Sequence, residues 1–250
     1  MSNAPDEPDA GGGPVAVYID GLNLFYGALR RTRWRWLDLG ALSDALAGLP
    51  VDRIVYCTAV ISSAGGRSGG PVRQQAYLKA VTSDPRVEVL RGRFLRSKVV
   101  RQLVGCEDPG SACFARIHDD EEKGSDVNLA SRLLHDGHLG RYRRAILVTG
   151  DSDLVEPVRL LVKEVGLGVE VVNPRKGRSR ELAGVASGYR GLDRGLLQRC
   201  QLPAAVERSG VTLVRPREWD PANEPADRSP ARHRGGGCCA ATGSLGFRKF

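Results

Sequence analysis

Short apolar runs alternate along the chain with segments in which apolar residues recur every three or four positions. The short runs are rich in β-branched residues and predict strands. These are Val15–Ile19, Arg53–Ile61, Val87–Arg91, Ala145–Thr149 and Gly168–Val172. The helical spacing predicts helices at Leu22–Arg30, Leu39–Leu46, Val72–Thr82, Asp126–Leu134, Leu154–Val165 and Arg180–Ala186. Because strands and helices alternate, we expect an α/β fold with a mostly parallel central sheet.

Other segments interrupt this alternation. Ser62–Pro71 is rich in glycine and predicts a loop. Phe94–Val104 predicts the arm of a hairpin, and Gly105–Asp120 is expected to be irregular. Residues 1–13 and 220–250 lack apolar periodicity, so we expect disordered tails around one domain at residues 14–219.

The composition shows that the predicted domain is basic. The net charge is +8, and residues 14–215 carry +9 because residues 1–13 hold only acids. A basic domain suits a polyanion such as RNA, although a surplus of arginine also follows from a GC-rich genome. The longest apolar runs are too short to span a bilayer, and the N-terminus does not resemble a secretory signal. We therefore expect no membrane partner and a cytoplasmic protein.

The cysteines do not change this expectation. None of the six shows C-x-x-C spacing, which favours reduced thiols. Cys106 and Cys113 flank a turn-like segment, and a zinc site that they share with a distant pair stays open as an alternative.

Aspartates stand where the predicted strands end. Asp20 ends the first strand, Asp151 and Asp153 follow the strand at 145–149, and Asp126 opens a helix. In a parallel sheet, ligands bind beyond the carboxyl ends of strands at the point where the strand order reverses. If the two strands are neighbours there, the carboxylates converge, and their mutual repulsion requires a cation. Oxygen ligands select Mg²⁺ or Mn²⁺, which can activate water for phosphodiester hydrolysis without a protein nucleophile.

Several residues in these segments also have a purely structural interpretation. Asp20 could cap the following helix, and Asn23 could be a turn residue. Asp153 with Glu156 three positions later fits a capping box, and Ser125 could cap the helix that Asp126 opens. It is the joint placement of the aspartates that favours a metal site.

Three ordered motifs carry a family resemblance. They are Val17–Leu24, Glu122–Ala130 and Val148–Leu154, followed by the weaker signals Gln201–Pro203, Arg215–Pro216 and Trp219. Over residues 14–219 the chain resembles the NYN domain family, in the LabA-like branch of PIN-like ribonucleases. The resemblance implies a Rossmann-like (PIN-like) three-layer sandwich that cleaves RNA with Mg²⁺ or Mn²⁺. It also implies Asp20, Asp126, Asp151 and Asp153 as the catalytic metal ligands, with Asn23 near them.

The chain departs from the family at one position. Many members carry a further Asp one turn along the helix of Asp126, where this sequence has Arg132. The site then has one carboxylate fewer, or Glu122 takes the place of the missing Asp. Glu122 and Ser152 are candidates for residues near the site. An RNA-binding or scaffold module with a degenerate site is the first alternative. A phosphatase is disfavoured because Leu22 stands where a D-x-D motif needs its second Asp.

Basic residues near the same predicted edge are candidates for substrate contacts. Arg175, Lys176, Arg178 and Arg180 follow the last predicted strand and could hold phosphates, as could Arg73 beside the glycine loop. Further basic runs lie at Arg93–Arg101 and Arg141–Arg144. Trp34 and Trp36 could stack bases, but a core position is favoured. Whether the protein forms a homo-oligomer stays open.

Overall fold

The computed structural model describes residues 13–60, 69–102 and 114–222. Within these residues the main sheet has seven strands in the order β4-β3-β2-β1-β5-β6-β7. The strands are β1 (Val15–Asp20), β2 (Arg53–Val60), β3 (Val87–Gln102), β4 (Phe114–Lys123), β5 (Arg144–Val148), β6 (Gly168–Asn173) and β7 (Gly188–Gly191). Every pair is parallel except β3 with β4. The predicted α/β class with a mostly parallel sheet is confirmed.

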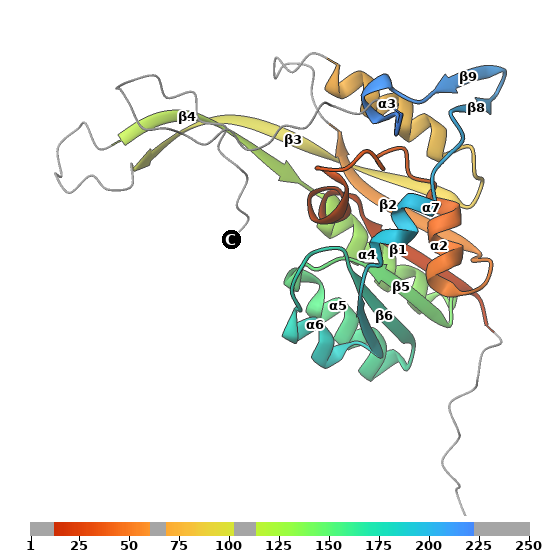
Figure 1. Ribbon diagram of the computed structural model, residues 1–250. Coiled ribbons are helices and arrows are strands. Elements are labelled where there is room, and N and C mark those ends of the chain that lie inside the picture. The colour runs from red at the N-terminus through yellow and green to blue at the C-terminus, as the bar shows by residue number, and fades with distance from the viewer. Residues whose placement is uncertain (1–12, 61–68, 103–113, 223–250) are drawn as a thin grey trace, which may run out of the picture.

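Helices cover both faces of this sheet (Figure 1). On one face lie α1 (Gly21–Leu24), the π-helical turn η1 (Phe25–Leu29), α2 (Leu39–Ala47), α3 (Gly70–Val81) and α7 (Arg194–Arg199). On the other lie α4 (Ser125–His138), the 3-10 turn η4 (Ser152–Leu154), α5 (Val155–Leu160), η5 (Leu161–Val165) and α6 (Arg180–Val185). The result is the three-layer sandwich that the resemblance implied.

The apolar run of β1 shows why the strand lies in the middle of the sandwich. Val17 and Ile19 pack into the core beneath α1 and α2, whereas Ala16 and Tyr18 pack into the core beneath α4. Successive side chains of a strand point to opposite faces, so a central strand needs apolar residues at every position. All six residues of β1 are buried.

The segment after residue 186 contains elements that the apolar pattern did not predict. Besides β7 and α7, it forms a two-stranded ribbon of β8 (Ala205–Arg208) and β9 (Val211–Val214), then the turn η6 (Arg217–Trp219). Trp36 is fully buried beneath this segment, and its indole Nε1 donates to the carbonyl of Pro203 at 2.8 Å. The core position favoured for Trp36 is confirmed.

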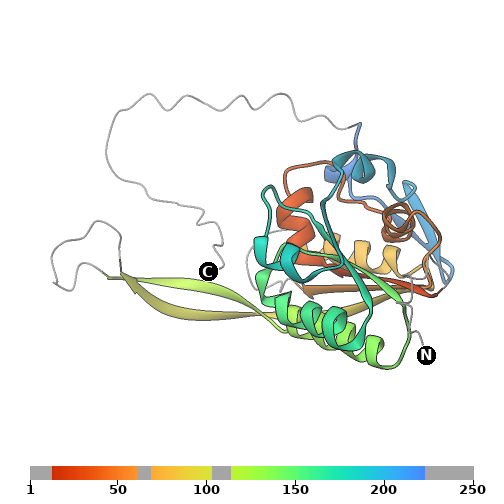
Figure 2. The ribbon, with the colours of Figure 1, turned by 90° about the horizontal axis from the view of Figure 1, so that it is seen from below.

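β3 and β4 form an arm that projects from the body (Figures 1 and 2). Beyond Arg93, β3 pairs only with β4. The predicted hairpin arm is correct for β3, but the irregular stretch predicted over Gly105–Asp120 is wrong from Phe114 onward. Apolar and polar positions alternate there only weakly, and pairing with β3 supplies the order that the local pattern lacks.

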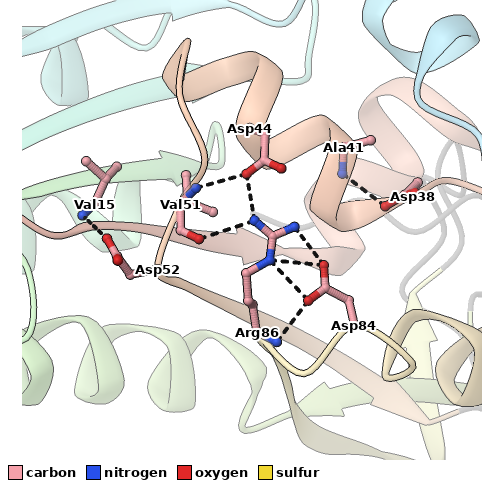
Figure 3. Close-up of polar contacts among 8 residues, drawn as sticks. All are labelled: Val15, Asp38, Ala41, Asp44, Val51, Asp52, Asp84 and Arg86. Carbon is pink, nitrogen blue, oxygen red and sulfur yellow. Dashed lines mark hydrogen bonds and ion pairs between the residues drawn. The ribbon is translucent and has the colours of Figure 1, made fainter.

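At the opposite, amino end of the sheet, Arg86 joins two elements (Figure 3). Its guanidinium binds the carboxylate of Asp44 in α2 and that of Asp84, both at 2.8 Å. Nearby, the carboxylate of Asp52 accepts from the backbone N–H of Val15 at the start of β1. These contacts fix α2 and the starts of the central strands at the edge opposite the carboxyl ends of the strands.

Candidate metal centre

The acidic residues meet where the strand order reverses. β1 lies between β2 and β5, and Ile19 is paired with Val148. Asp20 and the segment after β5 therefore leave the sheet side by side at its carboxyl edge. This is the adjacency of strands that the sequence argument required.

Three carboxylates come together at this edge. Asp20, Asp126 and Asp151 each offer an oxygen atom, and these atoms lie within 4.8 Å of one another. Asp20 is 2% exposed, whereas Asp126 and Asp151 are partly exposed. Asp126 reaches the group from the first turn of α4. We call Asp20, Asp126 and Asp151 the acidic group.

Hydrogen bonds from the neighbouring loops orient the most buried member. The Asp20 carboxylate accepts from the backbone N–H of Asn23 at 2.9 Å and from the Thr149 hydroxyl at 3.1 Å. Asn23 is itself buried, and its Oδ1 accepts from the N–H of Gly150 at 3.1 Å. Asp20 thus caps α1 and belongs to the acidic group at once, so the two interpretations of this residue do not compete.

Thr149 was not singled out from the sequence. It is buried, and its hydroxyl also accepts from the N–H of Asp151 at 3.1 Å, so it links two members of the acidic group. The signal that could have found it is a hydroxyl at the end of a strand that is otherwise wholly apolar, since a buried hydroxyl requires a partner.

Asp153 lies outside the acidic group. The turn η4 leaves Ser152 and Asp153 exposed, and the N–H of Asp153 donates to the Asp151 carboxylate at 3.2 Å. Asp153 does not form the predicted capping box either. No side chain caps α5, and Glu156 pairs with Arg159 at 2.7 Å. The structure therefore brings together three of the four predicted carboxylates.

Glu122, at the end of β4, and Arg132, within α4, both lie outside the acidic group. The Glu122 carboxylate accepts from the N–H of Ser125 at 2.9 Å and from its hydroxyl, so it satisfies the start of the helix that carries Asp126. Arg132 pairs with Glu88 of β3 at 3.0 Å. The expected position of Arg132 one turn beyond Asp126 is wrong: that place on the face of Asp126 is held by Ala130, because helical residues four apart share a face.

The basic loop Arg175–Arg180 adjoins the acidic group. Its four cationic side chains are exposed, and it follows β6 at the carboxyl edge. Buried Asn173 holds it, donating to the carbonyl of Gly177 at 2.9 Å and accepting from the N–H of Arg175 at 2.8 Å. A Cβ at Gly150 would lie 2.3 Å from the Asn173 amide oxygen, so the residue before Asp151 packs against the residue that holds the basic loop.

Arg73 lies in the first turn of α3 and is already engaged. It pairs with Glu218 at 2.8 Å. Arg35 lies beside it, and burial together with the charges of Arg73 and Arg30 lowers the pKa of Arg35. The structure therefore places Arg73 among arginines on the α3 side of the sheet.

A cysteine lies opposite Asp20 in the sheet register. Cys57 of β2 is fully buried, and burial, with the charge of Asp20 next, raises its pKa to about 12. At neutral pH this residue is a protonated thiol. Because the thiolate is the reactive form of cysteine, Cys57 is not a nucleophile for this site.

The acidic group fits a small divalent cation. Mg²⁺ binds oxygen at about 2.1 Å in an octahedron, so opposite ligands stand about 4.2 Å apart. Oxygens within 4.8 Å of one another can reach such an ion with small side-chain movements. Three carboxylates without nitrogen or sulfur ligands favour Mg²⁺ or Mn²⁺ over softer metals.

A family model extends the same picture to most of the chain. The model of the NYN domain matches residues 14–193. This chain belongs to the NYN domain family. The NYN domain runs from the start of β1 to the residue before α7, so it contains the whole acidic group and the basic loop. The family named from the sequence motifs is confirmed.

Two further proteins are similar to this NYN protein. The 6-hydroxy-3-succinoylpyridine 3-monooxygenase HspA of Pseudomonas putida is 32% identical over 232 residues, which cover 81% of this chain and 74% of the relative. A solved structure of a protein of unknown function from Vibrio parahaemolyticus has a TM-score of 0.46 and 17% identity, covering 75% of this chain and 97% of that one. Among the described residues, no helix is both long and apolar enough to cross a membrane.

Proposed function

We propose that this protein is a divalent-metal-dependent ribonuclease. The observation that carries the proposal is the acidic group, three carboxylates from distant parts of an NYN domain gathered at one sheet edge. The adjoining basic loop supports a polyanionic substrate, because cationic side chains hold phosphates. The net charge of +8 supports the same partner.

Each residue has a physical task in this proposal. Asp20, Asp126 and Asp151 would hold Mg²⁺ or Mn²⁺, which would activate a water and neutralise the phosphate oxygens during hydrolysis. Asn23 and Thr149 fix the Asp20 carboxylate through the hydrogen bonds described above. The basic loop would hold the RNA backbone beside the acidic group. Asp153 stays a candidate for a further ligand only if RNA or metal draws it inward.

The test compares two neighbouring aspartates. We expect the purified protein to cleave mixed RNA in Mn²⁺ or Mg²⁺ and to stop in EDTA. Asp151→Asn should lower the cleavage rate at least about a hundredfold, since it removes preorganised charge from the reacting centre. Asp153→Asn, an identical change two residues away and outside the acidic group, is the matched control and should cleave nearly as well as the parent.

Each failure of this test has a distinct meaning. RNA binding without cleavage in any metal would favour the alternative of an RNA-binding or scaffold module. Equal loss in Asp151→Asn and Asp153→Asn would show that Asp153 acts in catalysis as well. Cleavage that persists in EDTA would overturn the metal mechanism.

The similarity to HspA supplies a second candidate, the hydroxylation of a pyridine. A monooxygenase passes one oxygen atom of O₂ to its substrate and needs two electrons from a reductant. The acidic group has no histidine, whereas a common oxygen-activating iron site uses two histidines and a carboxylate. Incubation with 6-hydroxy-3-succinoylpyridine, NADH and added flavin should leave the substrate unchanged; its oxidation would favour this second candidate.

A further inference from the structure

A groove runs between the edge of β3 and α4, beside the acidic group. Its larger part encloses about 450 Å³ and is lined by Leu90, Arg91, Asn128, Ser131, Arg132, His135 and Arg141. A second hollow of about 290 Å³ shares Arg91 and Asn128 with it and adds Gly92, Arg93, Lys123 and Gly124. Because the two parts share lining residues, we treat them as one feature, the α4 groove.

The sheet edge and the helix both present polar groups to the α4 groove. β4 pairs with β3 only from Arg93 onward, so Val87–Gly92 has no described strand on that edge. The facing residues of α4 recur with helical spacing and form one stripe. They are Asn128, Ser131, Arg132 and His135. A helix face of this kind is suited to a polar ligand and not to closing a hydrophobic core.

The charged side chains that line the groove are all basic. No Asp or Glu lines either part of the groove. Arg132 and Arg141 are partly neutralised, by Glu88 at 3.0 Å and Asp136 at 2.8 Å. Arg91 and Arg93 are exposed, and neither makes an ion pair with another described residue. Arg91 and Arg93 are therefore cations of the groove that have no ion-pair partner among the described residues, whereas Lys123 pairs with Glu121.

The groove also leads to the acidic group. Its near end is formed by Lys123 and Gly124, directly before Ser125 and Asp126. A Cβ at Gly92 would lie 2.8 Å from Glu122 Oε1 and 2.9 Å from the N–H nitrogen of Ser125, so β3 is packed closely against the start of α4. The end of the groove is thus fixed relative to Asp126.

We propose that the α4 groove binds the phosphate backbone of the RNA strand next to the segment held at the acidic group. This inference rests on the proposed ribonuclease function and extends its substrate site along α4. The helix has 14 residues, about 21 Å at 1.5 Å per residue. A groove along this helix is therefore long enough to follow an RNA strand over several phosphates.

RNA is favoured over an acidic protein segment by the lining itself. Leu90 is the apolar side chain in the groove, so an entering peptide would find few apolar contacts. A nucleic acid strand needs only regularly placed cations and hydrogen-bond donors for its backbone, and Asn128 and Ser131 supply donors between the arginines.

The test measures the binding of RNA of two lengths to the full chain in EDTA, so that cleavage does not interfere. We expect a strand of about twenty nucleotides to bind more tightly, with a steeper salt dependence, than one of about four. The double variant Arg91→Ala, Arg93→Ala should lose affinity for the long strand, and its slope of log K against log salt should fall by about 1.4, or 0.7 for each contact. Its affinity for the short strand should stay the same.

A matched control removes the same charge elsewhere. Lys79→Ala, Lys163→Ala changes two exposed cations toward the amino edge of the sheet and should leave both affinities unchanged. As a second variant, Ser131→Lys adds a cation to the groove and should increase both the affinity for the long strand and its salt slope.

The outcomes separate this proposal from the ribonuclease function. If the Arg91, Arg93 variant and the control bind the long strand alike, the groove does not contact RNA, while cleavage by the parent would still support a ribonuclease. If Ser131→Lys has no effect on the long strand, the groove is likewise excluded. If the parent neither binds nor cleaves RNA of either length, both proposals are overturned.

Discussion

The Tyr18 hydroxyl in the middle of β1 donates a 2.8 Å hydrogen bond to the Asp136 carboxylate near the end of α4. Asp136 is fully buried, and it also binds Arg53 at 3.0 Å and Arg141 at 2.8 Å. Burial, followed by this hydrogen bond, raises the pKa of Tyr18 far above its usual value, so the phenol stays a donor. One buried carboxylate therefore ties α4, which carries Asp126, to the strand that carries Asp20.

The first prediction concerns this tie. Asp136→Ala should lower the free energy of unfolding by about 3 kcal/mol, because it leaves two arginines and a buried phenol without their acceptor. Tyr18→Phe should cost about 1 kcal/mol, since Asp136 keeps both arginines. Urea unfolding at pH 7 measures both values. Equal costs for the two variants would contradict the view that the carboxylate is the centre of the cluster.

Stability in acid should depend on Arg86. Burial opposes ionisation of Asp84, but its hydrogen bonds with Arg86 outweigh this and lower its pKa below 3.8. A lowered pKa stabilises the fold above pH 3.8, and this contribution is lost as the pH falls below that value. Arg86→Ala should therefore cost about 2 kcal/mol at neutral pH and clearly less near pH 3. Denaturant titrations at the two pH values measure the difference, and a cost independent of pH would contradict it.

Metal binding should be visible as thermal stabilisation. At about one hundred times its dissociation constant, Mn²⁺ should stabilise the parent by about 2.7 kcal/mol, or about 5–10 °C in Tm. Asp151→Asn should shift much less, because it loses one of three clustered carboxylates. Asp153→Asn should shift like the parent. Differential scanning calorimetry with and without Mn²⁺ measures all three, and an equal shift in all would remove Asp151 from the metal site.

The basic loop should contribute to RNA binding without contributing to chemistry. Replacing Arg175, Lys176, Arg178 and Arg180 with Ala should lower the salt slope of RNA binding by up to about 2.8, or 0.7 for each contact. Asp20→Asn should keep that slope but abolish cleavage. Salt-titrated binding and cleavage assays on both variants separate the two effects. An unchanged slope in the four-Ala variant would indicate that the RNA phosphates contact the α4 groove or the arginines around Arg73 instead.

The sequence predicted those helices and strands whose structure is indicated by their own residues. The strand at Val15–Ile19 and the helix at Leu39–Leu46 carry their own apolar pattern, and the structure matches them within one residue at each end. The position of Asp20 followed from the end of its strand. That position, together with the parallel topology, was enough to bring Asp20 and Asp151 to one edge.

The wrong predictions concern residues whose structure depends on contacts with distant parts of the chain, which a local sequence pattern does not indicate. Asp153 and Glu156 have capping-box spacing, but the chain enters α5 through the 3-10 turn η4, which leaves Asp153 exposed. β4 owes its order to pairing with β3. Thr149 and Asn173 look unremarkable in the sequence, and they matter only because folding buries them against the loops that hold Asp151 and Arg175.

The pairing of β1 with β5 has a consequence for the order of events during synthesis. Asp20 and Asp151 come from segments that the ribosome makes far apart in time, and they meet only when β5 docks against β1. A nascent chain that ends before Asp151 has no acidic group, however well its first half has folded. Any metal chemistry at this edge is therefore delayed until most of the domain has been translated.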